Sequence, residues 1–217
     1  MNRWRAVGDT GWLLDVELTG GDLLDARRVL AVAHQVQKAA GAGLVDGVVD
    51  VVPAAATVLV TTTPGRHARL GAWLATLALV TAMTGDEEGP PATMVTLRVR
   101  FDGDDLAATA DLTARSVEAL VATLTGVTWT AAFTGFAPGF AYLVGGGLDV
   151  PRRSSPRPLV PAGTLGLAGR YAGIYPRATP GGWRLIGRAV DLPRLFDAER
   201  SPPALISPGT RVRFVSA

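Results

Sequence analysis

Three arginines lie close together in a proline-rich part of the chain. They are Arg152, Arg153 and Arg157, and the surrounding prolines restrict the backbone conformations that are open to this segment. Guanidinium groups make bidentate contacts with carboxylates and phosphates, and a restricted backbone lowers the entropic cost of holding them together. The spacing therefore predicts an anion site. A solvated loop whose arginines bind a nearby acidic surface is the alternative that the sequence leaves open.

A glycine-rich turn follows these arginines in the sequence. It reads Thr179-Pro180-Gly181-Gly182-Trp183, so successive N–H groups at Gly181 and Gly182 are candidates for an anion nest that Trp183 closes on one side. A plain β-hairpin is the alternative reading of the same residues.

Aromatic residues are spaced through the segment before the arginines. Phe136, Pro138 and Phe140, together with Trp183 further on, are interpreted as lining a pocket or an interface, and Tyr142 is a further candidate. At such spacing, aromatic side chains are often part of a core instead. We expect at least one of them to have that role.

The residue inventory excludes several kinds of catalytic machinery. The chain has no cysteine, and Lys38 is its single lysine, so a GxxxxGK[ST] phosphate loop and a Ser-Ser-Lys triad are both absent. His34 and His67 lack HExxH spacing, and no metal site is expected. No catalytic residue is assigned from the sequence.

Basic residues are concentrated towards the end of the chain. Residues 1–149 contain ten Lys and Arg against sixteen Asp and Glu, whereas residues 150–217 contain eleven against three. This imbalance favours an anion site, or a basic segment that docks on an acidic neighbour. We expect no nucleic-acid partner, since the sequence shows no basic helix and no stacking-aromatic motif.

The overall composition is that of a globular protein. Of the 217 residues 48% are hydrophobic, which is ample for a core, and the lack of cysteine suits a reducing compartment. No apolar run follows the first arginines, and the most hydrophobic helix candidate, at 70–83, is too short to span a bilayer. We therefore expect a cytoplasmic protein with no membrane partner.

Hydrophobic periodicity predicts a small α/β domain at 1–88. A strand is expected at 11–18, followed by a helix that Asp22 caps and that ends at Gly41. Two strands are then expected at 44–52 and 57–63, with Pro53 in the turn between them, and a second helix from Pro64 to about Met83.

The acidic, proline-ended stretch at 85–91 is interpreted as the boundary to a second domain at 89–217. Strands are expected at 94–101 and 127–133, with helices at 106–111 and 114–125, the latter capped by Thr113. The strand at 94–101 would instead complete a βαββαβ pattern if it belonged to the first domain. After residue 134, short apolar runs between turns are typical of an all-β unit with long loops.

Long ordered motifs of the chain resemble those of a known family. GFAPGFAYL at 135–143, VPRRSSPRPLVPAG at 150–163 and GIYPRATPGGWRLIGR at 173–188 closely resemble the 5-oxoprolinase B subunit, a family also called KipI or allophanate hydrolase subunit 1. GDTGWLLDVEL at 8–18 and LFDAERSPPALISPGTRVRFV at 195–215 look like the same family. The resemblance therefore covers essentially the full length.

This resemblance implies a fold and a set of partners. The fold is α+β, with a small N-terminal α/β domain of βαββα type followed by a cyclophilin-like β-barrel, which corresponds to one piece of the carboxyltransferase domain of urea carboxylase. The family subunit pairs with a larger C-type subunit and works with an A-type subunit to open 5-oxoproline to glutamate with ATP. A composite site agrees with the incomplete machinery of this chain.

The resemblance also suggests roles for the candidate site residues. Arg152, Arg153 and Arg157 would hold a substrate carboxylate or phosphate, so removal of Arg153 would lower activity far more than thermal stability. The Gly181 and Gly182 N–H groups would donate to an oxyanion, and Tyr175 would supply a polar contact. These roles are hypotheses from chemistry.

One position departs from the family pattern. Many relatives carry a histidine where this chain has Leu124. If that histidine has an acid-base role, the partner supplies the group here or the activity differs. A structural histidine replaced by an apolar residue explains the difference equally well.

Two other functions are compatible with the resemblance. One is a carboxyltransferase subunit that uses carboxybiotin to carboxylate an amide such as urea. The other is an inhibitory module that binds a histidine kinase, as the name KipI implies. A cyclophilin-like fold by itself is weak evidence for prolyl isomerase activity.

Overall fold

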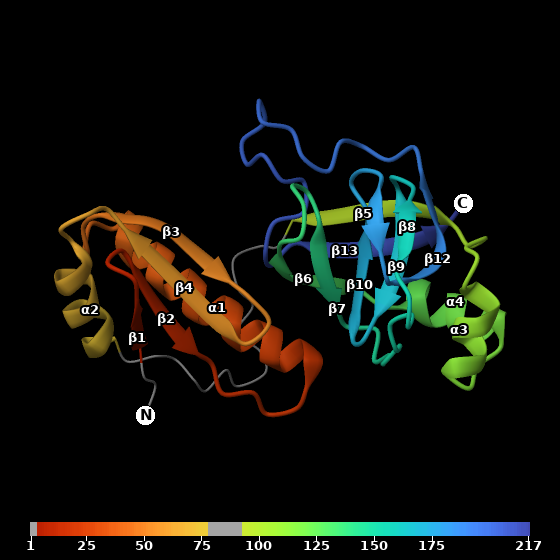
Figure 1. Ribbon diagram of the computed structural model, residues 1–217, viewed down its shortest axis with the longest axis horizontal. Helices are drawn as coiled ribbons and strands as arrows, with labels where there is room; N and C mark the ends of the chain where they lie inside the picture. Colours follow the sequence, from red (N-terminus) through yellow and green to blue (C-terminus); the bar gives the residue numbers. More distant parts are fainter. Residues whose placement is uncertain (1–3, 78–92) are drawn as a thin grey trace. The chain divides into compact units, whose positions relative to one another are not determined.

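The computed structural model describes residues 4–77 and 93–217. The chain divides into two compact units, Met1–Pro91 and Ala92–Ala217 (Figure 1). The domain boundary expected between residues 88 and 89 and the helix end expected near Met83 both lie outside the described residues. None of the helices in the described ranges is long and apolar enough to cross a bilayer.

The first unit is a four-stranded antiparallel sheet with two helices. Its strand order is β1 (Trp4–Val7), β2 (Gly11–Asp15), β4 (Thr57–Thr62) and β3 (Val48–Pro53), and its helices are α1 (Asp22–Gly41) and α2 (His67–Thr76). Strand β1 was not expected from the sequence, because its side chains show no buried and exposed alternation. Pro53, expected in a turn, is the last residue of β3.

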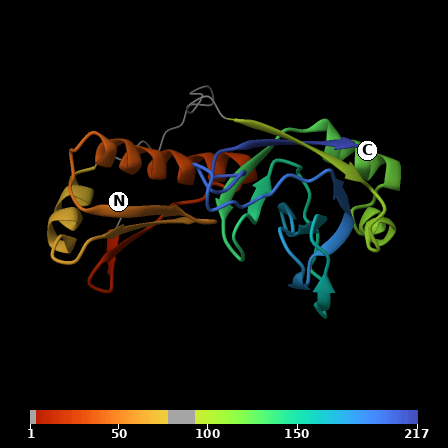
Figure 2. The same ribbon diagram turned by 90° about the horizontal axis from the view of Figure 1, so that it is seen from above.

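Helix α1 covers one face of this sheet. The ribbon of the helix runs along this face of the sheet (Figures 1 and 2). Its buried residues recur at helical spacing and pack with the aliphatic side chains of the strands. The expected cap was wrong, because Asp22 is the first helical residue and Gly21 is the cap. The nearby carboxylate of Asp25, 2% exposed, accepts the N–H groups of Thr19 at 2.8 Å and Gly20 at 3.2 Å and so fixes the chain entering the helix.

The second unit is a closed seven-stranded barrel. Only the pair β13 and β5 is parallel; the other neighbours are antiparallel. A separate two-stranded ribbon pairs β8 with β11. The barrel order is β10 (Tyr171–Ile174), β7 (Ala141–Val144), β6 (Trp129–Thr134), β13 (Arg211–Ser216), β5 (Met94–Arg100), β12 (Arg184–Val190) and β9 (Thr164–Ala168), and the ribbon strands are β8 (Arg157–Val160) and β11 (Thr179–Gly181).

Two short helices, α3 (Leu106–Leu112) and α4 (Val117–Gly126), pack beside β12 and β13. The second begins later than expected, since the side chain of Ser116 accepts the N–H of Ala119 at 3.1 Å and caps it. Thr113, the expected cap, instead ends α3. A serine in extended conformation suits this position better than a threonine that already bonds back to the preceding helix.

The barrel unit contains two separate buried clusters. The larger is mainly aliphatic and fills the barrel, with Trp129 and Phe214 as its aromatic members. The smaller is centred on the aromatic side chains of Phe140, Tyr175 and Trp183 and also contains Val160, Ala168 and Leu185. Strand β9 belongs to both, because Leu165 and Leu167 join the first cluster whereas Ala168 joins the second.

Candidate anion site

A loop at residues 151–157, here named the arginine loop, lies against a turn at residues 179–183, the glycine turn. The N–H of Arg153 donates to the carbonyl oxygen of Gly182 at 3.0 Å. The Nε of Arg184 donates to the carbonyl oxygen of Pro151 at 3.0 Å, and β8 and β11 pair beyond the loop. Residues that the sequence places about 20 to 33 positions apart are therefore held side by side.

A buried carboxylate binds two of the three arginines of this loop. Arg153 Nη1 donates to Asp105 Oδ1 at 3.1 Å, and Arg157 Nη2 donates to the same oxygen at 2.9 Å. Arg157 Nη1 also lies 2.9 Å from Oδ2, which is within ion-pair distance, although this nitrogen makes no hydrogen bond to a described residue. The N–H of Leu185 donates to Oδ2 at 2.7 Å and completes the set of partners.

The backbone around Asp105 explains why it is buried there. The N–H of Gly103 donates to Ile186 O and the N–H of Asp105 to Leu185 O, each at 3.0 Å, so this segment runs along β12. A β-carbon at Gly103 would overlap the carbonyl oxygen of Leu185, which makes glycine necessary at this close approach. Asp105 is 4% exposed as a result.

The charges of this cluster stabilise one another. Burial raises the pKa of the Asp105 carboxyl, but the hydrogen bonds from Arg157 and the Leu185 N–H and the charges of Arg157 and Arg153 together outweigh burial and hold the pKa below its usual value. The hydrogen bond to Asp105 likewise raises the pKa of Arg157. The Asp105 carboxylate is therefore ionised and Arg157 is charged at neutral pH.

Arg152 differs from its two neighbours. It is exposed, and no described carboxylate lies within ion-pair distance of it. Its charge acts on the hydroxyl of Tyr175, whose pKa is raised by burial despite a hydrogen bond with the Trp183 backbone and the charge of Arg152. The site therefore offers one free guanidinium beside a phenol that is neutral at neutral pH.

Aromatic rings form the floor of this site. The ring of Phe140 meets those of Phe136, Tyr175 and Trp183 edge-on, at centroid distances of 5.3, 5.6 and 5.3 Å. A β-carbon at Gly181 would lie 2.5 Å from the Tyr175 hydroxyl oxygen, so the glycine turn passes directly over this phenol. The rings joined by contacts of this kind, here named the aromatic cluster, are Phe133, Phe136, Phe140, Tyr142, Tyr171, Tyr175 and Trp183.

Phe136 is the strained and exposed member of the aromatic cluster. It has φ of +66°, a conformation that bulky side chains rarely adopt, and it is 57% exposed. Its ring nevertheless lies edge-on to Tyr175, at 6.2 Å between centroids. Strained residues concentrate at binding sites, and an exposed ring in such a conformation is consistent with one.

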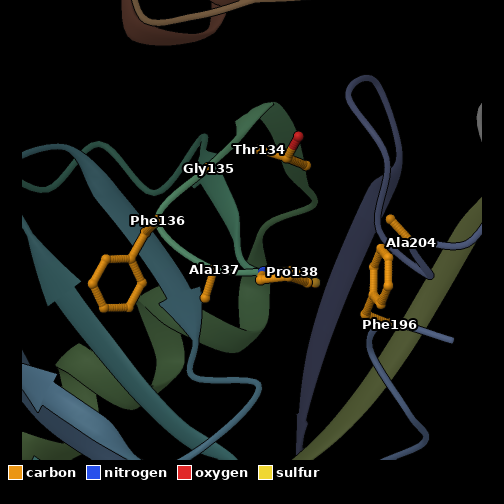
Figure 3. A pocket seen from close by; sticks show the side chains of 8 residues that line it. Thr134, Gly135, Phe136, Ala137, Pro138, Phe196 and Ala204 are labelled. Atoms are coloured by element: carbon orange, nitrogen blue, oxygen red, sulfur yellow. The ribbon is translucent and has the colours of Figure 1, made fainter. Parts of the chain in front are cut away.

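A pocket of about 420 Å³ opens beside the turn that carries Phe136. Pro138 and the ring of Phe196 face each other across the hollow, whereas the ring of Phe136 lies on the other side of the turn (Figure 3). Phe196 was not anticipated, because it lies almost 60 residues further along the chain. The pocket is lined by Thr134, Gly135, Phe136, Ala137, Pro138, Gly139, Phe196 and Ala204.

Most of the residues singled out in the sequence gather here, although in different environments. Phe140, Tyr175 and Trp183 are buried, at 2%, 2% and 5% exposure, so the ring of Trp183 belongs to the aromatic cluster and not to an open wall of the glycine turn. The backbone N–H of Trp183 is hydrogen-bonded to the hydroxyl of Tyr175. The N–H groups of Gly181 and Gly182 therefore remain the candidate backbone donors to an anion.

Leu124 and Asp105 have environments that the sequence did not indicate. Leu124 is fully buried in the aliphatic cluster, where its carbonyl oxygen accepts the Nε1–H of Trp129 at 3.0 Å, so a side chain at this position faces the barrel core. Asp105 was missed because it follows Asp102 and Asp104 in a polar turn. Only the excess of arginines over acids after residue 150 hinted that an acid from elsewhere was needed.

Comparisons with known proteins agree with this architecture. Residues 2–206 match the family model described as carboxyltransferase domain, subdomain C and D. The 5-oxoprolinase B subunit from Escherichia coli O157:H7 is 46% identical over 115 residues, 52% of each chain, and the protein of the same name from Bacillus subtilis is 42% identical over 117 residues, 52% of this chain and 47% of that one. The chain thus spans about half the length of these curated relatives.

Solved structures share the fold over nearly the whole chain. TTHA0988 superimposes with a TM-score of 0.75 at 34% identity, covering 95% of this chain and 40% of that one. The urea carboxylase of Kluyveromyces lactis superimposes with a TM-score of 0.71 at 18% identity, over 99% of this chain and 21% of that one, a likeness of fold alone.

Proposed function

Since the chain belongs to the carboxyltransferase domain family of subdomains C and D, we propose that it is a non-autonomous subunit of a heteromeric ATP-dependent amidohydrolase that opens 5-oxoproline to glutamate. The observation that carries this proposal is its similarity, at 38–46% identity, to three curated proteins that are named as the B subunit of 5-oxoprolinase. That name also implies further subunits, for which a C-type and an A-type protein are the candidates.

The geometry supports a substrate role for the open side of the anion site. Arg152 is suited to bind the carboxylate of 5-oxoproline, since its guanidinium is exposed and not neutralised by a described acid. The N–H groups of Gly181 and Gly182 are candidate donors to the oxygen on which negative charge develops when water attacks the activated lactam carbonyl. The neutral hydroxyl of Tyr175 lies directly against Gly181.

The chain itself lacks the residues that hold a nucleoside triphosphate in a P-loop. Lys38, its single lysine, lies in the last turn of α1 and not in a glycine-rich loop. We therefore assign ATP to a partner subunit or to a surface shared with one. ATP would supply the phosphoryl group that activates the lactam carbonyl.

Co-expression with the candidate A-type and C-type subunits tests the proposal. We expect the purified complex to consume ATP only when 5-oxoproline is added, and to form glutamate in equal amount. The matched control is the same preparation without this chain, which should be inactive. A correctly assembled complex that shows no substrate-dependent turnover would exclude the proposed reaction.

A carboxyltransferase reaction is the second candidate, and the description of the matching family favours it. On this reading the anion site holds a carboxyl group in transit between carboxybiotin and an amide such as urea. Activity would then require a biotinylated protein. Turnover that avidin abolishes in the assembled complex would support this candidate, whereas turnover that avidin does not affect would exclude it.

A further inference from the structure

Asp105 is the buried carboxylate of the barrel unit. Among residues 93–217, it is the one Asp or Glu whose exposure places it with the core, at 4%. Its oxygens accept hydrogen bonds from Arg153, Arg157 and the Leu185 N–H, so its capacity as an acceptor is largely used inside the protein. Both arginines therefore have an internal counter-charge, although one carboxylate offsets only one of their two positive charges.

The position of Asp105 links three segments that are far apart in the chain. It follows β5, its backbone runs along β12, and its side chain reaches the arginine loop some 50 residues later. The loop is also attached through the backbone contacts of Arg153 and Pro151 and, at its end, through the pairing of β8 with β11. The carboxylate therefore contributes to the direction in which the loop presents its remaining arginine.

We propose that Asp105 is a positioning residue, an internal carboxylate that occupies Arg153 and Arg157 so that Arg152 alone is presented to an external carboxylate or phosphate group. The identity of that ligand rests on the proposed function. The positioning itself is a property of this chain, and its test requires neither substrate nor partners.

Stability alone is a weak reason for this arrangement. Replacement of a buried ion pair by apolar side chains of similar volume is often neutral or stabilising, because desolvation offsets the Coulomb attraction. A carboxylate that takes up two of three adjacent guanidinium groups has a clearer consequence for binding. It leaves one guanidinium group, that of Arg152, without an ion-pair partner among the described residues. This suits a ligand with a single anionic group and disfavours ligands that must bind several arginines at once.

Arginine-specific labelling of the full chain with phenylglyoxal tests the proposal. In the wild-type protein, we expect Arg152 to react rapidly with phenylglyoxal and Arg153 and Arg157 to be protected. Mass spectrometry of the peptides follows the reaction at each arginine. In Asp105→Ala, we expect the rates at both protected arginines to rise by about tenfold or more, since a lost buried pair is worth more than one tenfold step. Formate, a carboxylate that fits the vacated space, should restore the protection.

Matched controls separate this result from unfolding. Asp104→Ala removes an exposed acid that acts on Arg157 only through its charge, and it should leave all three labelling rates unchanged. Arg200, which donates to the carbonyl oxygens of Arg194 and Pro203, serves as an internal reference for a folded barrel. If Asp105→Ala does not fold, Asp105→Asn keeps an acceptor for Leu185 and should show the same direction of change.

Kinetics in the assembled complex provide a second readout. Asp105→Asn should raise KM for 5-oxoproline by about tenfold and change kcat by less than about threefold, as expected for a residue that orients a binding group. Equal labelling rates at the three arginines of the wild-type protein would overturn the inference. Protection of Arg153 and Arg157 that persists in a folded Asp105 variant would overturn it as well. An inactive wild-type complex would instead count against the proposed reaction and leave the labelling result standing.

Discussion

Ion pairs of equal length have different surroundings in the two units. In the first unit, Arg5 Nε lies 3.1 Å from Asp15 Oδ2, with side chains that are 59% and 63% exposed. In the second, Arg153 Nη1 lies 3.1 Å from Asp105 Oδ1, and the carboxylate side chain is only 6% exposed. The distance between the charged atoms therefore says little about how much an ion pair contributes to stability. A buried carboxylate identifies the pair whose geometry is set by the fold.

The largest expected difference between these pairs is in stability. Asp105→Asn should lower the free energy of unfolding by about 3 kcal/mol, because two partly buried guanidinium groups lose their counter-charge. Asp15→Asn removes an exposed partner and should cost less than about 0.5 kcal/mol. Urea denaturation of both variants measures the difference. Equal losses would show that burial does not distinguish the two pairs.

A second comparison separates the roles of adjacent arginines. Arg152→Ala should lower kcat/KM of the assembled complex by about 10- to 100-fold, the effect of losing one charged hydrogen bond to the substrate, with little change in melting temperature. Arg153→Ala should lower both quantities, because Arg153 binds Asp105. This revises the sequence-based expectation that loss of Arg153 would affect mainly activity. Parallel turnover and thermal unfolding measurements decide it, and identical profiles for the two variants would contradict the distinction.

The smallest expected effect is in the dependence of stability on pH. The pKa of Asp105 is lower in the folded protein than in the unfolded chain, so its contribution is fully present above the unfolded value of about 3.9 and is lost as pH falls through the lower folded value. The wild type should therefore lose stability more steeply than Asp105→Asn below about pH 4. Unfolding free energies of both proteins from strongly acidic to neutral pH test this, and parallel curves would argue against a lowered pKa.

Much of the fold was predictable because local patterns report burial. The helix ending at Gly41 and the strand at 94–101 follow from periodicity, since each has one face in the core. Strand β1 and the start of α4 were not predicted correctly. The first has no alternation of burial, and the second depends on which of two hydroxyl residues, Thr113 or Ser116, accepts a helical N–H.

The candidate site was predictable in part, for a related reason. The residue types in the arginine loop and the glycine turn indicated anion binding, and the structure brings both segments together. Their environments were not predictable. Trp183 and Phe136 are both large aromatic residues beside glycine, yet one ring is buried at 5% exposure and the other stands out at 57%.

The sequence by itself determined that the site is rich in guanidinium groups, rigid in backbone and without a lysine or cysteine of its own, because composition and proline spacing are local properties. Tertiary structure alone decided which guanidinium group remains exposed and without an ion-pair partner in the part of the chain that the structure describes. That choice depends on Asp105, a residue some 50 positions away, whose charge becomes decisive only when β12 and the loop exclude water from it.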